Sequence, residues 1–492
     1  MAVESIPKPS MTPEQVAIVK STAPILKEHG VAITTHFYAA MLAAHPSLHN
    51  IFNRANQATG DQPRALASLV FAFAAHADDL PALEPAIRRV VHRHVSLQVQ
   101  PAHYPIVGEF LIAAVAHILG PDTVTPAVAD AWTAAYAVLA DIFVSAEADM
   151  YRDNQDRVDP VTAHKIWPTP AGHDGWRPFV IQRRVNESPD GRIVSFYLVP
   201  QDALPSSSDE GLGPKQHQPL PTFLPGQYIS IRVPVPEHGG GKILQPRQYS
   251  LSDAPGKDYY RITVKRDVEQ HVVAESQQGH HPQVRPAGLV SNILHDNYKE
   301  GDIVEVTYPM GEFYPPSKND EDVLPNGAEK PMVLISAGVG ITPVMSILNT
   351  VLAAANGSSS EGGGAKRPSS RRSRSSRKAP ITWIHGSHST TARAFHEHVA
   401  EVVSAHPGVV SAHLFLTVPP GDSSNTENGV QGREGEGQGH ERQKGGLFLD
   451  DPTAEYFVCG PRGFMDAVRD YLVEKNGVDE ARVFREVFGT GS

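Results

Sequence analysis

The chain has 492 residues, of which 40% are hydrophobic and 20% charged, and its formal net charge is −11. This length predicts about three domains, because a single hydrophobic core rarely serves so long a chain. The acidic balance excludes a general attraction for nucleic acids or anionic membranes and favours small-molecule substrates.

The N-terminal stretch "MAVESIPKPSM" has neither the apolar core of a signal peptide nor the Arg-rich character of a transit peptide. In the sequence, no apolar run reaches the roughly 18 residues that span a bilayer. The single cysteine, Cys459, excludes an intramolecular disulfide and fits a reducing compartment. We therefore expect a cytoplasmic protein without a transmembrane segment.

Residues 11–151 are rich in Ala, Leu and Val and follow helical periodicity. The stretch starts with "TPEQ", in which Thr12 and Gln15 suit a capping box and Pro13 suits the first helical position. These features predict an all-α domain.

The remaining chain predicts two further domains of different type. Residues 174–318 contain short β-branched and aromatic runs separated by Gly, Pro and Asp, a pattern typical of an antiparallel β-barrel or sandwich. Residues 329–492 alternate apolar strands with helical stretches, which indicates a doubly wound parallel α/β domain. The expected fold class is therefore a multidomain α+β chain.

Four polar stretches are too poor in apolar residues for us to expect them to pack, namely 203–219, 268–286, 356–379 and 419–445. The third contains "KRPSSRRSRSSRK", which could serve nuclear localisation or RNA contact. A solvated loop is the favoured interpretation of this tract on composition.

Three histidines lie close together in "VVHRHVSLQVQPAHY". On a helix with about 100° per residue, one face carries Ile87, Val90, Val91, His94 and Leu97. The opposite face carries Arg88, Arg89, His92, Arg93 and Ser96. We therefore expect His94 to point into the core and His92 to face solvent, while His103 follows Pro101 outside the helix. If one histidine binds a ligand it is His94; the alternative is an ordinary buried histidine.

The spacing of His94, Ser96, Pro101 and Tyr104, with "THFYAAML" upstream and "AWTAAYAVLADIF" downstream, resembles the globin domain of flavohemoglobins. The resemblance to flavohemoglobins as a whole covers essentially the entire chain outside the four polar stretches. It implies that His94 is the proximal ligand of the iron of heme b. It also implies that Tyr104 and Glu147 hydrogen-bond the other ring nitrogen, which raises imidazole basicity and favours O2 activation over O2 storage.

The same resemblance implies a distal pocket. Tyr38 would donate a hydrogen bond to the gaseous ligand, and Phe52 would pack against the porphyrin. Gln62 and Leu66 are four residues apart and share one helical face that can overlie the heme. Arg93 stands where the family usually has Lys, and it can still pair with a heme propionate.

"RQYSL" resembles the flavin-binding motif of the ferredoxin-reductase superfamily. This resemblance implies that Arg247 binds the FAD pyrophosphate, that Tyr249 lies beside the flavin, and that Ser250 lies near its reactive edge. "GLVSNIL" can open a helix whose free N–H groups hold the pyrophosphate, although a plain helix start is the alternative. Further residues assigned to FAD are Tyr228, Gln248, Gly288, Val290 and Ser291.

Two motifs resemble the nicotinamide-binding half of that superfamily, "SAGVGITP" and "CGPRGFM". The residues assigned to NADH or NADPH on this basis are Gly338, Gly340, Thr342, Pro343, Cys459, Gly460 and Pro461. Near the C-terminus, Glu486 and Phe488 would flank the flavin and nicotinamide rings. The sequence leaves open which of the two nucleotides is preferred.

These modules imply an electron path, because NAD(P)H gives up a pair of electrons whereas heme iron accepts one, and a flavin can mediate between them. The family resemblance implies a nitric oxide dioxygenase that converts NO and O2 to nitrate. The alternatives are an NAD(P)H oxidase or peroxide reductase, and a heme-based O2 or NO sensor. The expected partners are NO, O2 and NAD(P)H, with no nucleic acid, and the chain is expected to be a monomer.

Overall fold

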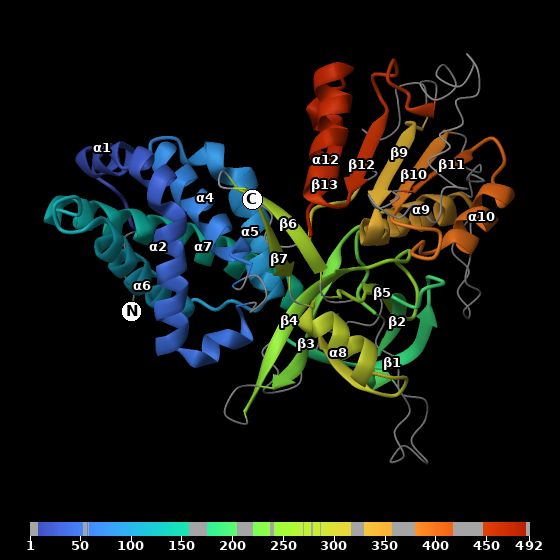
Figure 1. The fold of residues 1–492 in the computed structure, drawn as a ribbon, viewed down its shortest axis with the longest axis horizontal. Coiled ribbons are helices and arrows are strands. Elements are labelled where there is room, and N and C mark those ends of the chain that lie inside the picture. Colours follow the sequence, from blue (N-terminus) through green and yellow to red (C-terminus); the bar gives the residue numbers. More distant parts are fainter. Residues whose placement is uncertain are drawn as a thin grey trace.

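Three structural units follow one another along the chain, and Figure 1 shows them as a helical unit, an antiparallel β unit and a parallel α/β unit. The computed structural model describes residues 8–52, 57, 59–156, 175–203, 220–236, 241–268, 270–276, 279–285, 287–315, 329–356, 379–416 and 446–488. The antiparallel unit lies between the other two and contacts both.

The N-terminal unit is all-α, as predicted. Its helices are α1 (Pro13–Ser21), α2 (Ala23–Ala44), α4 (Asp61–Ala75), α5 (Glu84–Ser96), α6 (His103–Leu119) and α7 (Pro126–Asp156). The capping box at the start of α1 is confirmed, because the Gln15 N–H donates to Thr12 Oγ1 at 3.2 Å and the Thr12 N–H donates to Gln15 Oε1 at 2.9 Å. Helix α2 packs on α4 and α6, while α7 packs on α1, α5 and α6.

Helix α7 differs from the expectation, drawn from the sequence, that no segment is long and apolar enough to span a bilayer. Its residues Pro126–Asn154 are long and apolar enough to cross a membrane by length and composition. In the fold, however, this helix packs against three others and carries a buried carboxylate at Glu147. Both features are those of a core helix of the helical unit, where alanine-rich surfaces allow close helix packing.

The second unit contains one six-stranded antiparallel sheet in the order β4-β3-β8-β1-β2-β5. The strands are β1 (Arg177–Asn186), β2 (Ile193–Pro200), β3 (Tyr228–Pro236), β4 (Lys242–Ser250), β5 (Tyr260–Lys265) and β8 (Ile303–Val306). An isolated bridge between Leu251, directly after β4, and Ile262 of β5 joins the two edges at one point, so the sheet curls towards the expected barrel without closing along its edges. The expected helix after Gly288 is α8 (Leu289–Asn297).

One of the four polar stretches is partly structured, contrary to expectation. Within 268–286, β6 (Gln270–Ser276) pairs antiparallel with β7 (Gly279–Arg285). The prediction from composition was wrong for this segment, because an antiparallel hairpin satisfies its backbone hydrogen bonds by local pairing. Most of the other three stretches, including the basic Ser/Arg tract, lies outside the described residues.

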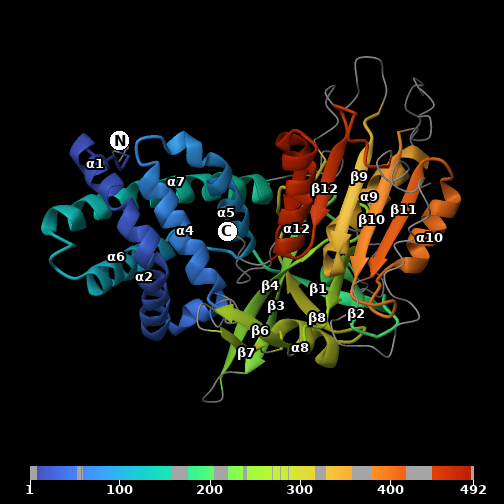
Figure 2. The same cartoon turned by 45° about the horizontal axis from the view of Figure 1, so that its top comes forward.

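The third unit is a parallel sheet in the order β11-β10-β9-β12-β13, which confirms the doubly wound prediction. Its elements are β9 (Met332–Ala337), α9 (Ile341–Asn356), β10 (Ile381–Ser387), α10 (His396–Ala405), β11 (Val410–Leu416), β12 (Glu455–Cys459), α12 (Arg462–Arg469) and β13 (Val483–Glu486). Helices α9 and α10 share one core with the sheet, and α12 shares another on the opposite face. Figure 2 shows β9 to β12 side by side. The strand order reverses at β9 and β12, where doubly wound sheets bind ligands.

Candidate functional site

His94, Tyr104 and Glu147 come together from three helices of the helical unit. His94 Nδ1 lies 2.7 Å from Glu147 Oε1 and 3.1 Å from the Tyr104 hydroxyl, which itself donates to the same carboxylate oxygen at 2.5 Å. Because a carboxylate can only accept, Nδ1 carries the proton and Nε2 is left with a free lone pair. Among the described residues, Nε2 has no hydrogen-bond partner. This is the arrangement of an imidazole prepared to bind a metal.

The cluster is built around the buried side chain of Glu147. The Glu147 side chain is 2% exposed, and its second oxygen, Oε2, is buried without a hydrogen-bond partner among the described residues. Burial and the neighbouring carboxylate both raise the pKa of Tyr104, so its hydroxyl stays protonated and donates.

Two tyrosines that the sequence did not single out hold this cluster in place. Tyr136 and Tyr151 project from α7, the helix of Glu147, and donate to the carbonyls of Tyr104 at 2.6 Å and Val99 at 2.8 Å. Both carbonyls lie between or at the ends of α5 and α6. The spacing of Glu147 and Tyr151, one helical turn apart, is the signal that could have found one of them.

The distal residues also converge. Tyr38 on α2 is 6% exposed, its ring lies 5.6 Å from that of Phe52, and its hydroxyl hydrogen-bonds Gln62. Burial raises the pKa of Tyr38 and the bond to Gln62 opposes that rise. The Gln62 oxygen in turn accepts from Gln57 at 2.8 Å, and the half-buried Leu66 lies one turn further along α4. The hydroxyl is therefore a neutral donor in an apolar setting.

Part of the polar face of α5 is covered by the other units, whereas Arg88 and Arg89 on that face stay exposed, and this corrects the expectation that His92 faces solvent. Ser96 is fully buried and accepts a hydrogen bond from Gln248 of β4 at 2.7 Å. His92 Nδ1 accepts from the Gly311 N–H at 3.3 Å. Arg93 donates to the Val487 carbonyl at 3.3 Å, near the C-terminus. Helical periodicity separates polar from apolar faces, but it cannot distinguish water from a second domain.

The flavin motif lies on β4, beside β3. Strand alternation places Arg247 and Tyr249 on one face and Gln248 and Ser250 on the other. Burial lowers the pKa of the Arg247 guanidinium, and its hydrogen bond within the described chain is to the neighbouring Pro246 carbonyl. A half-buried cation with spare donors suits a phosphate ligand.

Tyr228 faces Ser250 in the register of β3 and β4. Burial is the main cause that raises the pKa of Tyr228, and it likewise raises the pKa of Tyr249. Both phenols are therefore neutral. They provide aromatic surfaces on opposite faces of this strand pair.

The start of α8 fits the other half of a pyrophosphate site. Gly288 is its N-cap residue and makes no side-chain cap, so the first N–H groups of the helix are not capped by a side chain. A Cβ at Gly288 would lie 2.7 Å from Asp267 and from Ser291 Oγ, which requires glycine here. Asp267 also acts electrostatically on Arg247, whereas Val290 is buried and anchors the helix.

The two nicotinamide motifs meet at the reversal point of the parallel sheet. Gly340, in the turn after β9, lies so close to Cys459 that an added Cβ would overlap the Cys459 carbonyl. Gly460, in the turn after β12, packs against Ala337 and Phe464 in the same way. Gly338 has a positive φ of 55°. The backbone thus approaches closely at the expected crevice.

The other residues of these motifs begin the two helices. Thr342 Oγ1 donates to the Val339 carbonyl at 3.0 Å, and Pro343 lies in the first turn of α9, where proline needs no donor. Pro461 is the N-cap residue of α12. Cys459 is fully buried, and burial raises the pKa of its thiol well above the usual value, so it is not a thiolate nucleophile.

Glu486 lies beside Cys459 in the register of β12 and β13. Burial raises the pKa of Glu486 to about 7; Arg93 opposes this rise and Glu312 adds to it. The C-terminal strand therefore brings a titratable carboxyl close to α5. Phe488, two residues later, is 40% exposed.

A buried histidine beside the β9 motif is expected to make the α/β unit acid-sensitive. His385 is 2% exposed and hydrogen-bonds Ser336 Oγ at 2.9 Å, and burial lowers the pKa of His385 to about 4. The unfolded chain takes up this proton near pH 6.5, so the contribution to stability is complete above that pH and is lost as the pH falls towards 4. The shift corresponds to roughly 3 kcal/mol at most.

Lowering the pH from 7 to 5 should weaken the hydrogen-exchange protection of β9 and β10 in the unmodified protein, after correction for intrinsic exchange. We therefore expect His385→Gln to lose less of this protection over the same pH range. His388→Gln, at an exposed position just beyond β10, is the matched control. Equal acid sensitivity in both variants would show that His385 is not the responsible group.

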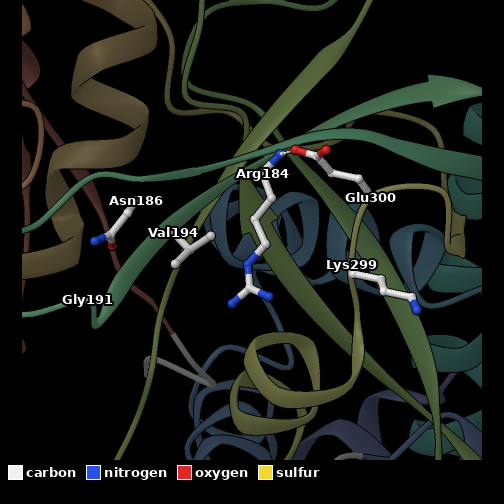
Figure 3. A pocket seen from close by; sticks show the side chains of 6 residues that line it. All are labelled: Arg184, Asn186, Gly191, Val194, Lys299 and Glu300. Atoms are coloured by element: carbon white, nitrogen blue, oxygen red, sulfur yellow. Dashed lines mark hydrogen bonds between the residues drawn. The ribbon is translucent and has the colours of Figure 1, made fainter.

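An open hollow of about 570 Å³ is lined by residues of β1 and β2, of the turn between them and of the segment after α8 (Figure 3). Its Arg184 donates to the carbonyls of His295 at 2.8 Å and Tyr298 at 3.1 Å, at the C-terminal end of α8. This cation complements the negative end of the helix dipole. Glu300 accepts from the Arg184 N–H at 2.9 Å, and the hollow contains no residue of the predicted sites.

Comparison with known proteins agrees with these modules. Residues 35–143 match the globin family model, and residues 334–470 match the model of oxidoreductase NAD-binding domains. The flavohemoprotein of Deinococcus radiodurans is 38% identical and covers 97% of this chain and 97% of its own length. That of Bordetella parapertussis is 36% identical and covers 98% of this chain and 99% of its own length.

A solved structure supports the same arrangement of the fold. The crystal structure of flavohemoglobin from Malassezia yamatoensis with bound FAD and heme has a TM-score of 0.65 and 22% identity, and covers 97% of this chain and 100% of that one. The two matched modules and the near full-length relatives show that this chain belongs to the flavohemoprotein family of oxidoreductases.

Proposed function

We propose that this protein is an NAD(P)H-dependent nitric oxide dioxygenase that converts NO and O2 to nitrate. The observation that carries the proposal is the hydrogen bond from His94 to the buried Glu147, with Tyr104 on the same oxygen. An anionic acceptor makes the imidazole a stronger electron donor, which suits O2 activation better than reversible O2 storage.

The residues present fit the three groups that this activity needs. His94 offers Nε2 to heme iron, and the imidazole is oriented through Nδ1. Arg247 and the uncapped start of α8 offer donors to the FAD pyrophosphate. The glycine-lined crevice at Gly340 and Gly460 allows a dinucleotide to approach the backbone. The flavohemoglobin from Malassezia yamatoensis, which has the same fold, binds both FAD and heme.

Bound FAD supplies a carrier that accepts hydride from NAD(P)H and passes electrons singly to heme, where O2 binds. Within this scheme, Glu147 and Tyr104 fix the orientation and proton of His94. Tyr38, supported by Gln62, donates a hydrogen bond to the gaseous ligand, and Leu66 and Phe52 keep water away from it. Forming one nitrate from NO and O2 requires one electron. Because NAD(P)H supplies two electrons, one NAD(P)H supports two turnovers.

The functional units proposed for this scheme are residues 11–151 for heme, 174–318 for FAD and 329–492 for NAD(P)H. In this proposal Arg93 pairs with a heme propionate, and it also donates a hydrogen bond to the Val487 carbonyl just after β13. The proposal includes a cytoplasmic monomer acting on small molecules.

The test is stopped-flow NO consumption in air-saturated buffer with nitrate assayed as product. We expect rapid NO-dependent NADH oxidation, with about twice as much nitrate formed as NADH consumed. NADH oxidation that ignores NO would indicate an oxidase or peroxide reductase instead. Negligible turnover with ligand-dependent partner binding would indicate a sensor.

Tyr38→Phe is expected to retain heme but to release O2 roughly tenfold faster, because one hydrogen bond of about 1 kcal/mol or slightly more is removed from a buried site. The measurement is the O2 dissociation rate of the reduced protein by flash photolysis or ligand exchange. Tyr471→Phe, at an exposed tyrosine of the α/β unit, is the control. An unchanged O2 dissociation rate in Tyr38→Phe would remove this hydroxyl from the mechanism.

A further inference from the structure

A three-residue segment, Gly311–Phe313, contacts all three structural units. It follows β8 and belongs to the antiparallel unit, which carries the candidate flavin residues. Each of its residues makes a different contact, and together these contacts link the flavin strand, the helix of His94 and the parallel sheet.

Gly311 fixes the segment to β3. Its φ is 111°, and an added Cβ would lie 2.8 Å from the ring of Tyr228. The preceding residue, Met310, exchanges two backbone hydrogen bonds of 2.8 Å with Tyr228. The Gly311 N–H points the other way and donates to His92 Nδ1 on α5. The glycine is therefore required by both the backbone conformation and the close approach.

Phe313 joins the segment to the parallel sheet. Its side chain is 3% exposed, and its ring lies 5.9 Å from that of Phe457 on β12, in an edge-to-face arrangement. Phe457 in turn stacks on Phe484 of β13 at 4.8 Å. This end of the segment is held by an apolar core.

Glu312, between these two anchors, is the charged contact with the helical unit. Its carboxylate pairs with the Arg88 guanidinium and lies 3.9 Å from His92 Nε2. The Glu312 side chain is 23% exposed, whereas that of Arg88 is 60% exposed. An ion pair of this exposure contributes little to stability. Charges at the rim of an interface nevertheless fix orientation and respond to salt.

We propose that Glu312 is a positioning residue that holds the α5 helix of His94 in register against the flavin strand and thereby sets the rate of electron delivery to the heme. The inference rests on the cofactors of the proposed function. The step is a one-electron transfer in which reduced flavin is oxidised, ferric iron becomes ferrous, and the flavin proton passes to solvent. Interfaces between domains of one chain move by default, so the fixed contacts at this junction decide the docked geometry.

The first experiment follows anaerobic reduction of the holoprotein by NADH in a stopped-flow instrument, with flavin bleaching and the heme Soret shift recorded separately. Glu312→Gln and Arg88→Glu are expected to leave flavin reduction unchanged and to slow heme reduction roughly three- to tenfold. Arg88→Glu combined with Glu312→Arg restores the pair with reversed charges and should recover most of the rate. Arg89→Glu, adjacent on α5 and exposed, is the matched control.

The salt dependence of heme reduction distinguishes a positioning role of Glu312 from a role in folding alone. Between about 0.02 and 0.5 M salt, heme reduction in the unmodified protein should slow as the exposed pair is screened, whereas in Glu312→Gln it should not change. A wild-type rate in Glu312→Gln, or a double variant as slow as the single ones, would overturn the proposal.

Hydrogen exchange gives a readout that does not depend on heme activity. Glu312→Gln should raise exchange in peptides covering 84–96 and 310–313 and leave that of β9 and β12 unchanged. Unchanged exchange at 84–96 would contradict the inference. Absence of heme reduction in the unmodified protein would instead count against the proposed function, and the exchange result would still decide the role of Glu312.

Discussion

His94→Ala is expected to abolish heme retention while NADH still reduces the flavin. The imidazole is the only described group of the proximal cluster with a free ring nitrogen facing away from its hydrogen-bond partners. Its loss also removes one of the two donors to the buried Glu147, so that Tyr104 alone is left to compensate this carboxylate, and weakening the compensation of a buried carboxylate is costly. The measurement is the ratio of Soret to flavin absorbance in protein purified after hemin reconstitution.

His103→Ala is the matched control, because His103 lies in the same sequence stretch and, within the described part of the chain, its ring accepts a hydrogen bond from a backbone N–H alone, that of Gln100 at 2.9 Å. This variant should keep its heme. Heme retained in His94→Ala with an unchanged Soret band would show that the metal ligand is misassigned, and would remove the basis of the proposed function.

Arg247→Ala is expected to lose FAD while retaining heme. The guanidinium is half-buried, and in the described chain its hydrogen bond is to the Pro246 carbonyl, so most of its donors remain for a phosphate. Each charge-assisted hydrogen bond contributes about 1.5–3 kcal/mol, so losing a bidentate contact should weaken FAD binding roughly a hundredfold or more. The measurement is FAD content after gel filtration and the dissociation constant from flavin fluorescence.

Lys242→Ala removes a cation from the exposed start of the same strand and should leave FAD affinity unchanged. Equal FAD content in both variants would place the pyrophosphate elsewhere. Loss of heme in Arg247→Ala would indicate a folding defect that extends beyond the flavin strand, rather than a local binding role.

Some of the candidate site could be predicted because its signals are local. A helix of 3.6 residues per turn dictates that His94 shares a face with Ile87 and Val91, and the latter two are buried in the fold. The glycine at Gly340 was predictable because close backbone approach leaves no room for a Cβ. The alternation of strands and helices after residue 329 likewise indicated a parallel sheet.

Other features depended on contacts between distant parts of the chain. Ser96 and Gln248 are 152 positions apart and hydrogen-bond each other, although helical periodicity places Ser96 only on the face of α5 opposite His94. Tyr136 and Tyr151 were not singled out, because a tyrosine on a helix does not reveal which carbonyl it meets. The hairpin of β6 and β7 was not predicted, because backbone hydrogen bonds can pair two strands even where the side chains are mostly polar.

By itself, the sequence determined the order of the three units, the inward face of α5 and the glycines at the nucleotide crevice, because each follows from local periodicity or from the space that one side chain needs. Only the tertiary structure decided that the polar face of α5 docks on the flavin unit and that Gly311–Phe313 joins all three units. The physical reason is that a polar surface is satisfied equally well by water and by complementary polar groups, and only the assembled fold shows which of the two it meets.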